Sequence, residues 1–493
     1  MSPSVEPFDE DKYKALMDGL ECSEINKKYI EKKTYDFRIE SEFFKKKDLA
    51  LLSKLGRLNV MMLENGLVET VTDGTHFTPT YIDEGIPFLS AINVKENCFN
   101  PTAGYKFISK EEHFQLCKRV HPKHGDILLR KVGVGPRWAC VVPYNAFDFS
   151  IFVSVALIRS KINPYYLATY LNSKYGQLQL LRFNKGISQP DLHLEDIRKT
   201  IVPIFSDRFY STIEYAVRKA EQSFIKSFEK SDEAEMHFEQ ILHIKRIEML
   251  NTAVSVKQLS ESLKSMGRLD AEYYQPKYDI LFGELKKFSC IRLGGPNGIV
   301  NIKKSIEPGS DAYEEEGIPF VRVSDVSKYG ITPTETYLSH DVVENVETLF
   351  PKKNTILFSK DGSVGIAYKL ERDEDIITSG ALLHLTVKNT SEVLPDYLTL
   401  VLNSPVVQMQ AERDSNGAII QHWKPSEIEN VIIPVLDMDK QKELAEMVQK
   451  SFELRCHSKQ LLEYAKQAVE MAIEQSEDAA LAWLSGKVPN VEV

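Results

Sequence analysis

Two clusters of cationic and amide side chains, each beside a pair of glycines, are the residues best suited to contact another molecule. In the first half of the chain Lys131 precedes a Gly-Val-Gly turn, and in the second half Lys360 precedes a Gly-Ser-Val-Gly turn. Because glycine has no side chain, backbone amides in such turns can closely approach a phosphate or the edge of a base. A tight hairpin turn explains the same pattern equally well.

The side chains around these turns strengthen the nucleic-acid interpretation. They combine cations that bind phosphate, amides that can pair with a base edge and a ring that can stack. The candidates for DNA contact in the first half are Arg130, Lys131, Arg137, Trp138, Arg182, Lys185, Ser188 and Gln189. Those in the second half are Arg322, Lys360, Ser363, Asn416, Gln421, His422 and Lys424, with Lys328 in the same stretch. Only residues 101–200 carry a clear excess of Lys and Arg, so in the acidic second half an ordinary solvated surface is an equally good interpretation.

Catalytic and metal-binding patterns are missing from the sequence. Asn163-Pro-Tyr-Tyr166 is similar to the loop that holds a target amino group in amino-methyltransferases, but a helix start explains it better, and no S-adenosylmethionine turn accompanies it. No phosphate-binding loop is present, and the histidines show no metal-ligand spacing. Asp191 and Glu195 come closest to a nuclease carboxylate pair, but they lie in a predicted loop-to-helix segment. We therefore expect no catalytic residue, no metal and no cofactor in this chain.

Composition indicates a globular protein of several domains. The chain has 493 residues, 43% of them hydrophobic and 27% charged, and a formal net charge of -10. We expect no signal peptide, because the first residues are acidic, and no membrane span, because no apolar run approaches about 20 residues. The six cysteines form no CxxC pair, so we expect reduced cysteines and a cytoplasmic location.

The elements that position the two clusters form an internal repeat of about 230 residues. Gly85-Ile-Pro-Phe88 matches Gly317-Ile-Pro-Phe320, and Leu171-Asn-Ser173 matches Leu402-Asn-Ser404. Six such matches keep the same order in both halves, including the segments that close on Ile201-Val-Pro203 and Ile432-Ile-Pro434. Each copy alternates short β-branched runs with Gly, Pro and Asn, and Pro164 and Pro395 each predict the start of one short helix. The pattern predicts two strand-rich domains.

A long amphipathic helix is predicted after each domain. Apolar residues recur every three or four positions from about 206 to 248 and again from about 438 to 484. Two such stripes bury each other best in an antiparallel pair, which would place the domains apart and make the helices a spacer. The predicted fold class is α+β: two repeated strand-rich domains, each followed by a long helix, with the helices paired as an antiparallel coiled coil.

These patterns predict five segments. They are an N-terminal helical extension (1–50), a first strand-rich domain (51–205), a first spacer helix (206–250), a second strand-rich domain with its leading segment (251–437) and a second spacer helix with its tail (438–493).

The doubled order of motifs closely resembles the specificity subunit of type I restriction-modification systems. The resemblance covers about residues 35–480 and rests on Gly-Ile-Pro-Phe, Gly-Asp-Ile-Leu leading into Lys-x-Gly-x-Gly, Tyr-Leu followed by Leu-Asn-Ser, a Gly-x-x-Gln loop and a closing Ile-Val-Pro. It aligns Gly186-Ile-Ser-Gln189 with Gly417-Ala-Ile-Ile-Gln421, with one extra residue in the second copy. Two features depart from the family pattern, namely the acidic second domain and the extension before Arg38.

The resemblance implies a non-catalytic, cytoplasmic subunit that serves DNA methylation and phage defence. Each target recognition domain would read one half of a bipartite, asymmetric site in double-stranded DNA, while the helices set the spacer. The partners would be two modification (methyltransferase) subunits, which bind S-adenosylmethionine, together with a motor-nuclease restriction subunit.

Two alternatives remain open at the level of sequence. The chain could serve a solitary adenine methyltransferase or another phage-defence complex that lacks a cleaving subunit. It could also be a protein scaffold that no longer binds DNA, as its acidic second repeat allows. Salt-dependent DNA affinity would separate the scaffold from the DNA-binding alternatives.

Overall fold

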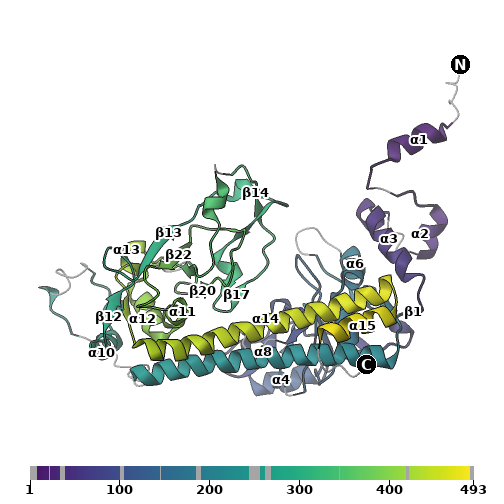
Figure 1. The fold of residues 1–493 in the computed structure, drawn as a ribbon. Coiled ribbons are helices and arrows are strands. Elements are labelled where there is room, and N and C mark those ends of the chain that lie inside the picture. Colours follow the sequence, from purple (N-terminus) through teal and green to yellow (C-terminus); the bar gives the residue numbers. More distant parts are fainter. Residues whose placement is uncertain are drawn as a thin grey trace. The chain divides into compact units, whose positions relative to one another are not determined.

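The computed structural model describes residues 8–21, 23–33, 39–99, 105–144, 146–184, 190–243, 256–260, 268–342, 345–417 and 421–488 (Figure 1). These residues form two compact units, one of residues 1–223 with 457–493 and the other of residues 224–456. Within the described residues, no helix combines the length and the apolar character that a membrane span requires. The N-terminal segment contributes three helices to the first unit, namely α1 (Glu10–Met17), α2 (Lys27–Lys33) and α3 (Lys46–Leu55).

A four-stranded antiparallel sheet forms the centre of the first repeat. Its strands, in spatial order, are β2 (Val68–Asp73), β10 (Val155–Ser160), β7 (Ile127–Arg130) and β8 (Ala139–Val141). Alternate residues of β7 and β10 point to opposite faces, so both faces are buried. One face packs on helices α5 (Pro164–Asn172) and α6 (Lys174–Arg182).

Smaller elements complete the first repeat. They are the sheet of β6 (Lys106–Ile108), β3 (Ile86–Leu89) and β9 (Ser150–Ile151), the hairpin of β4 (Val94–Lys95) and β5 (Cys98–Phe99), the pair β1 (Val60–Met62) and β11 (Ile201–Pro203), and helices α4 (Lys110–Cys117) and α7 (Leu194–Arg198).

The main sheet of the second repeat has the same strand order as that of the first. The sheet runs in the order β13 (Val300–Lys304), β22 (Leu382–Val387), β19 (Ile356–Ser359) and β20 (Ala367–Lys369). A second sheet contains β14 (Tyr313–Glu314), β18 (Tyr337–Leu338), β15 (Ile318–Val321) and β21 (Ile377–Thr378). The remaining elements are β16 (Val326–Ser327), β17 (Gly330–Ile331), β12 (Cys290–Arg292), β23 (Ile432–Pro434), α10 (Pro276–Leu285), α11 (Pro395–Asn403), α12 (Pro405–Asp414) and α13 (Pro425–Ile428).

Equivalent side chains make the same hydrogen bonds in both repeats. The Asn172 amide bonds both the N–H and the carbonyl of Ala139, and the Asn403 amide does the same for Ala367. Tyr166 donates to Pro203 O at 2.6 Å, as Tyr397 donates to Pro434 O at 2.8 Å, and Gln179 and Gln410 bond equivalent closing strands in the same way. The duplication inferred from the sequence is therefore present in three dimensions.

The prediction of one short helix after Pro164 and after Pro395 was wrong. Each site holds two consecutive helices, α5 with α6 and α11 with α12, which meet at Ser173 and at Ser404. The Ser173 hydroxyl accepts from Gly176 N at the start of α6, whereas Pro405 begins α12 without needing an N–H partner.

The two long helices are α8 (Asp207–Leu242) and α14 (Met438–Glu474). In the first unit the apolar stripes of the two helices share one core, and the Ser223 hydroxyl lies 3.1 Å from His457 Nδ1. The hydroxyl of Ser206, just before α8, donates a hydrogen bond to the carboxylate of Glu477, beyond the end of α14. In the second unit Ser451 Oγ donates to Ser227 O at 2.7 Å, and His237 lies 3.8 Å from Glu443. Residue numbers rise along α8 as they fall along α14, so the pairing is antiparallel, as predicted.

The second long helix ends earlier than the sequence pattern predicts. It stops at Glu474, and a separate helix, α15 (Glu477–Lys487), begins after Ser476, whose hydroxyl accepts from Ala479 N. The apolar periodicity continues through this break, which is why the sequence pattern did not reveal it.

Candidate nucleic-acid interface

Both glycine turns are held in place by an equivalent pair of backbone hydrogen bonds. In the first repeat Gly133 N donates to Pro190 O at 3.0 Å, and Leu192 N donates to Lys131 O at 2.9 Å. In the second repeat Gly362 N donates to Gln421 O at 2.9 Å, and Trp423 N donates to Lys360 O at 2.8 Å. We call each pair of crossing segments a junction: residues 131–137 with 190–192, and residues 360–365 with 421–423.

The junctions correct the sequence alignment of the two repeats. The backbone pairing places Gln421 where the first repeat has Pro190, so Gln421 is not the equivalent of Gln189 and the second copy needs no extra residue. The length difference lies in the glycine turn instead. Gln177 bonds the carbonyl of Arg137 and Gln408 bonds that of Gly365, so Arg137 occupies the place of Gly365.

Arg137 holds the first junction together from inside. Its side chain is fully buried and donates to Asn184 Oδ1 at 2.7 and 3.0 Å, to Gly133 O at 2.5 Å and to Pro190 O at 3.2 Å. Burial and the neighbouring charge of Arg130 lower the pKa of Arg137 to about 10, so its guanidinium stays protonated at neutral pH. This position favours a role in shaping the turn over direct contact with DNA.

The two lysines that precede the glycines are also engaged within the protein. Lys131 is buried, with its Nζ 3.2 Å from Asp73 and 3.6 Å from Asp191. Lys360 is ion-paired with Asp361, and its side chain is only 12% exposed. Both lysines therefore stabilise their junctions in this structure.

The remaining first-repeat candidates have different environments. Arg130 directs its guanidinium at Val134 O (2.5 Å), and Trp138 is half-buried and accepts from Arg130 N through its backbone carbonyl. Arg182 bonds Phe43 O and lies 3.9 Å from the ring centroid of Phe43, which fastens α6 to the segment before α3. Lys185, Ser188 and Gln189 lie outside the described residues.

The second junction gathers most of the second-repeat candidates on one exposed surface. His422 Nδ1 lies 2.8 Å from Asp361 Oδ1, and the backbones of His422 and Asn416 exchange hydrogen bonds of 2.7 and 3.0 Å. Five candidate side chains are exposed around this contact, namely Ser363, Asn416, Gln421, His422 and Lys424. The arrangement offers amide, hydroxyl, imidazole and ammonium groups together, which are the groups that read base edges and bind phosphates.

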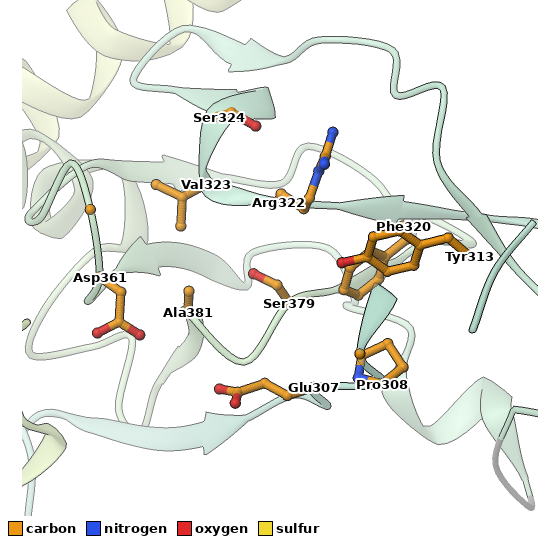
Figure 2. Close-up of a pocket in the computed structure, with 12 residues that line it drawn as sticks. Glu307, Pro308, Tyr313, Phe320, Arg322, Val323, Ser324, Asp361, Ser379 and Ala381 are labelled. Atoms are coloured by element: carbon orange, nitrogen blue, oxygen red, sulfur yellow. The ribbon is translucent and has the colours of Figure 1, made fainter. Parts of the chain in front are cut away.

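Arg322 lines an open hollow of about 440 Å³ together with Asp361 and Gly362 of the second junction. Figure 2 shows Arg322 and Ser324 along one side of this hollow, with Asp361 and Glu307 across from them and the rings of Tyr313 and Phe320 at one end. The backbone N–H of Arg322 donates to Asp325 at 2.9 Å, and its guanidinium lies 3.7 Å from the same carboxylate. An arginine held beside carboxylates presents donors and acceptors to one ligand surface.

The residues considered for catalysis have structural partners. Asn163 Oδ1 accepts from Tyr165 N and Tyr166 N at 3.0 and 3.1 Å, which confirms the interpretation as a helix start. Asp191 lies beside Lys131, and Glu195 pairs with Lys199 at 3.1 Å. Over the described part of the chain, no three His, Cys, Asp or Glu side chains are grouped closely enough to hold a metal ion.

Sequence reasoning missed the acidic members of the interface. Asp361, Glu307 and Asp325 line or support the hollow, yet no carboxylate is among the candidates for DNA contact. A signal was available for Asp361, because the repeat aligns it with Val132 inside an otherwise similar turn.

A comparison with known protein families matches part of the chain. Residues 296–463 match the model of the type I restriction modification DNA specificity domain. No curated protein matches the sequence.

Solved structures similar to this chain are type I specificity subunits or come from type I systems. One is the S subunit of a type I restriction-modification system from M. genitalium (13% identity, 87% of this chain and 96% of that chain covered, TM-score 0.32). Another is the HsdS subunit from Thermoanaerobacter tengcongensis (14% identity, 85% and 97% covered, TM-score 0.27). A third comes from a study of the assembly of the type I R-M system (13% identity, 85% and 97% covered, TM-score 0.27).

The family model covers the second repeat and most of α14, and the first repeat has the same sheet order, the same side-chain hydrogen bonds and the same junction. Residues 296–463 are thus similar to the type I restriction modification DNA specificity domain, and the first repeat has the same main sheet and the same junction.

Proposed function

We propose that each repeat of this non-catalytic subunit reads one half of a bipartite and asymmetric site in double-stranded DNA. The observation that carries the proposal is the junction. Both repeats form it with the same pair of backbone hydrogen bonds, but with different side chains. Pro190 and Asp191 in the first copy are replaced by Gln421 and His422 in the second. Two junctions with the same backbone hydrogen bonds and different side chains are suited to reading two different base sequences.

The second repeat is acidic, yet its junction surface suits base reading. Gln421, Asn416 and Arg322 are exposed there and can form paired hydrogen bonds with base edges in the major groove. The carboxylates beside them can accept from the amino group of cytosine. Phosphate contacts would come from local cations such as Lys424, whose side chain is 69% exposed, and from partner subunits.

The long helices would set the distance between the half-sites and dock two modification subunits. Those subunits, rather than this chain, would bind S-adenosylmethionine and methylate the DNA, and a motor-nuclease subunit would join them for cleavage. If no cleaving subunit exists, the same chain would guide a solitary adenine methyltransferase, and the neighbouring genes distinguish these two cases.

The test is selection of DNA from a randomised duplex pool by the complex of this chain with its modification subunits, at several salt concentrations. We expect a consensus with two dissimilar halves and an affinity that falls steeply with salt. Gln421→Ala should relax the preference within one half only. Asn430→Ala is the matched control. It removes an exposed amide of the same repeat that donates only locally, to Ser426 O in α13, so it should leave the consensus unchanged. Failure to select any sequence would overturn the proposal and favour a protein scaffold.

A further inference from the structure

Each repeat carries a small β-hairpin whose turn contacts one of the long helices. The hairpins are β4–β5 in the first repeat and β16–β17 in the second, and their registers match, with Val94 opposite Phe99 and Val326 opposite Ile331. Glu96 and Lys328 therefore occupy the same position in the two turns.

Both turn residues form an ion pair with a long helix. Glu96 Oε1 lies 2.8 Å from Lys466 Nζ on α14, and Lys328 Nζ lies 2.6 Å from Glu235 Oε1 on α8. The helix partners are equivalent as well, because Lys466 and Glu235 lie the same number of residues after Pro434 and Pro203, the last residues of β23 and β11. One contact is thus made twice with its charges exchanged.

The ion pairs are partly shielded from solvent. The side chains of Glu96 and Lys466 are 31% and 21% exposed, and those of Glu235 and Lys328 are 26% and 32% exposed. Burial opposes the charge of both lysines, but hydrogen bonds to Glu235 for Lys328, and to Glu463 and Glu96 for Lys466, leave the pKa of both lysines above the ordinary value. Salt screens such pairs less than fully exposed ones, so like charges at these positions would repel each other.

Aromatic packing reinforces the contact in the second repeat. Tyr329 follows Lys328, and the Arg455 guanidinium from α14 lies 4.0 Å from the Tyr329 ring centroid and 4.4 Å from that of Phe228 on α8. The Tyr329 and Phe228 rings meet edge to face at 5.1 Å. The first repeat has Asn97 at the equivalent position, where its backbone N–H donates to Ala139 O instead. The second hairpin is therefore held on both helices of the pair.

We propose that these hairpin contacts position each recognition repeat on the helix pair, and that their opposite polarity assigns each repeat to its own helix. A first-repeat hairpin placed on α8 would bring Glu96 against Glu235. A second-repeat hairpin placed on α14 would bring Lys328 against Lys466. Either placement on the other helix replaces an attractive ion pair with two like charges. The charges of the hairpin turns therefore favour the arrangement in which the first hairpin contacts α14 and the second contacts α8. The inference rests on the proposed reading of a bipartite site, whose spacer length is the quantity that positioning controls.

The test measures how strictly the full complex discriminates spacer length. Duplexes carry the selected half-sites with the natural spacer or with one base pair added or removed. We expect Lys328→Glu to reduce the discrimination between spacers by about tenfold, because a like-charge contact removes the fixed orientation of the second repeat. The double variant Lys328→Glu with Glu235→Lys should restore it. Lys352→Glu is the matched control, since it reverses a lysine of the same repeat that pairs with Asp373 on the exposed surface.

A merely structural role predicts a different outcome, in which Lys328→Glu lowers thermal stability while the preference for the natural spacer is kept. That result, or a double variant that fails to recover discrimination, would overturn the inference. If Lys328→Glu does not fold, the milder Lys328→Gln takes its place, and unchanged discrimination in that variant counts equally against the inference. Absence of any bipartite preference in the unaltered complex would instead contradict the proposed function itself.

Discussion

Replacing Arg137 with methionine tests whether this side chain shapes the first junction. Methionine keeps the unbranched apolar stem of the side chain but lacks the guanidinium and therefore every donor. Asn184 Oδ1 and Gly133 O then lose the hydrogen bonds that Arg137 donates, and Pro190 O keeps only its bond from Gly133 N.

The expected destabilisation follows from the environment of these acceptors. Hydrogen bonds to a charged group contribute about 1.5–3 kcal/mol each, but water can reach the half-buried Gly133 and Asn184 once the guanidinium is gone. We therefore expect a loss of about 3–5 kcal/mol, at the upper end for single substitutions.

Hydrogen exchange followed by mass spectrometry localises this effect. The amides of β7 and β8 should lose protection in Arg137→Met, while those of β19 and β20 in the second repeat serve as the internal reference. Arg372→Met, which removes an exposed arginine paired with Glu374, should change protection by less than about 0.5 kcal/mol. A loss below about 1 kcal/mol at β7 and β8, or an equal loss in both repeats, would refute the structural role of Arg137.

Three further predictions concern single side chains. Asn403→Ala should destabilise the second repeat by about 2 kcal/mol, because Ala367 loses both hydrogen bonds that tie β20 to α11, and exchange at β20 measures this. Burial raises the pKa of Glu221 to about 7, so the native state keeps a proton that the unfolded chain releases. The free energy of unfolding of the first unit should therefore fall, by on the order of 3 kcal/mol, as pH rises from about 4.5 to 7, and urea titrations of Glu221→Gln should show a flatter profile. The buried Trp423 ring packs against Phe358 in the second repeat, with the two ring centroids 5.8 Å apart. Trp423→Ala should therefore lower the free energy of unfolding of the second repeat by about 3–5 kcal/mol in urea titrations, and a loss under about 1 kcal/mol would contradict this packing.

Sequence patterns predicted the parts of the fold that depend on local periodicity and on duplication. The repeated Leu-Asn-Ser and Ile-x-Pro segments marked equivalent elements because their side chains hold the same strands in both halves, as Asn172 and Asn403 do. The apolar stripes of α8 and α14 predicted their pairing because two long stripes bury each other.

Other features depend on contacts that sequence patterns do not record. Arg137 is a candidate for DNA contact by its residue type, yet it is buried, and two of its acceptors, Asn184 Oδ1 and Pro190 O, come from segments about 50 residues further along the chain. The relation of Gln421 to Pro190 was hidden because one residue of length difference lies in the glycine turn, and only the backbone pairing locates it. The helix breaks at Ser173 and Ser476 depend on side-chain caps within continuous apolar patterns.

The most direct test of bipartite DNA recognition is methylome sequencing of the native host and of a strain that lacks this gene. We expect one split, asymmetric motif carrying modified adenine to disappear in the deletion strain and to return with the complementing gene. Its two halves should differ, and its spacer should be fixed in length. A methylome that is unchanged by the deletion would contradict the account that this chain directs DNA methylation.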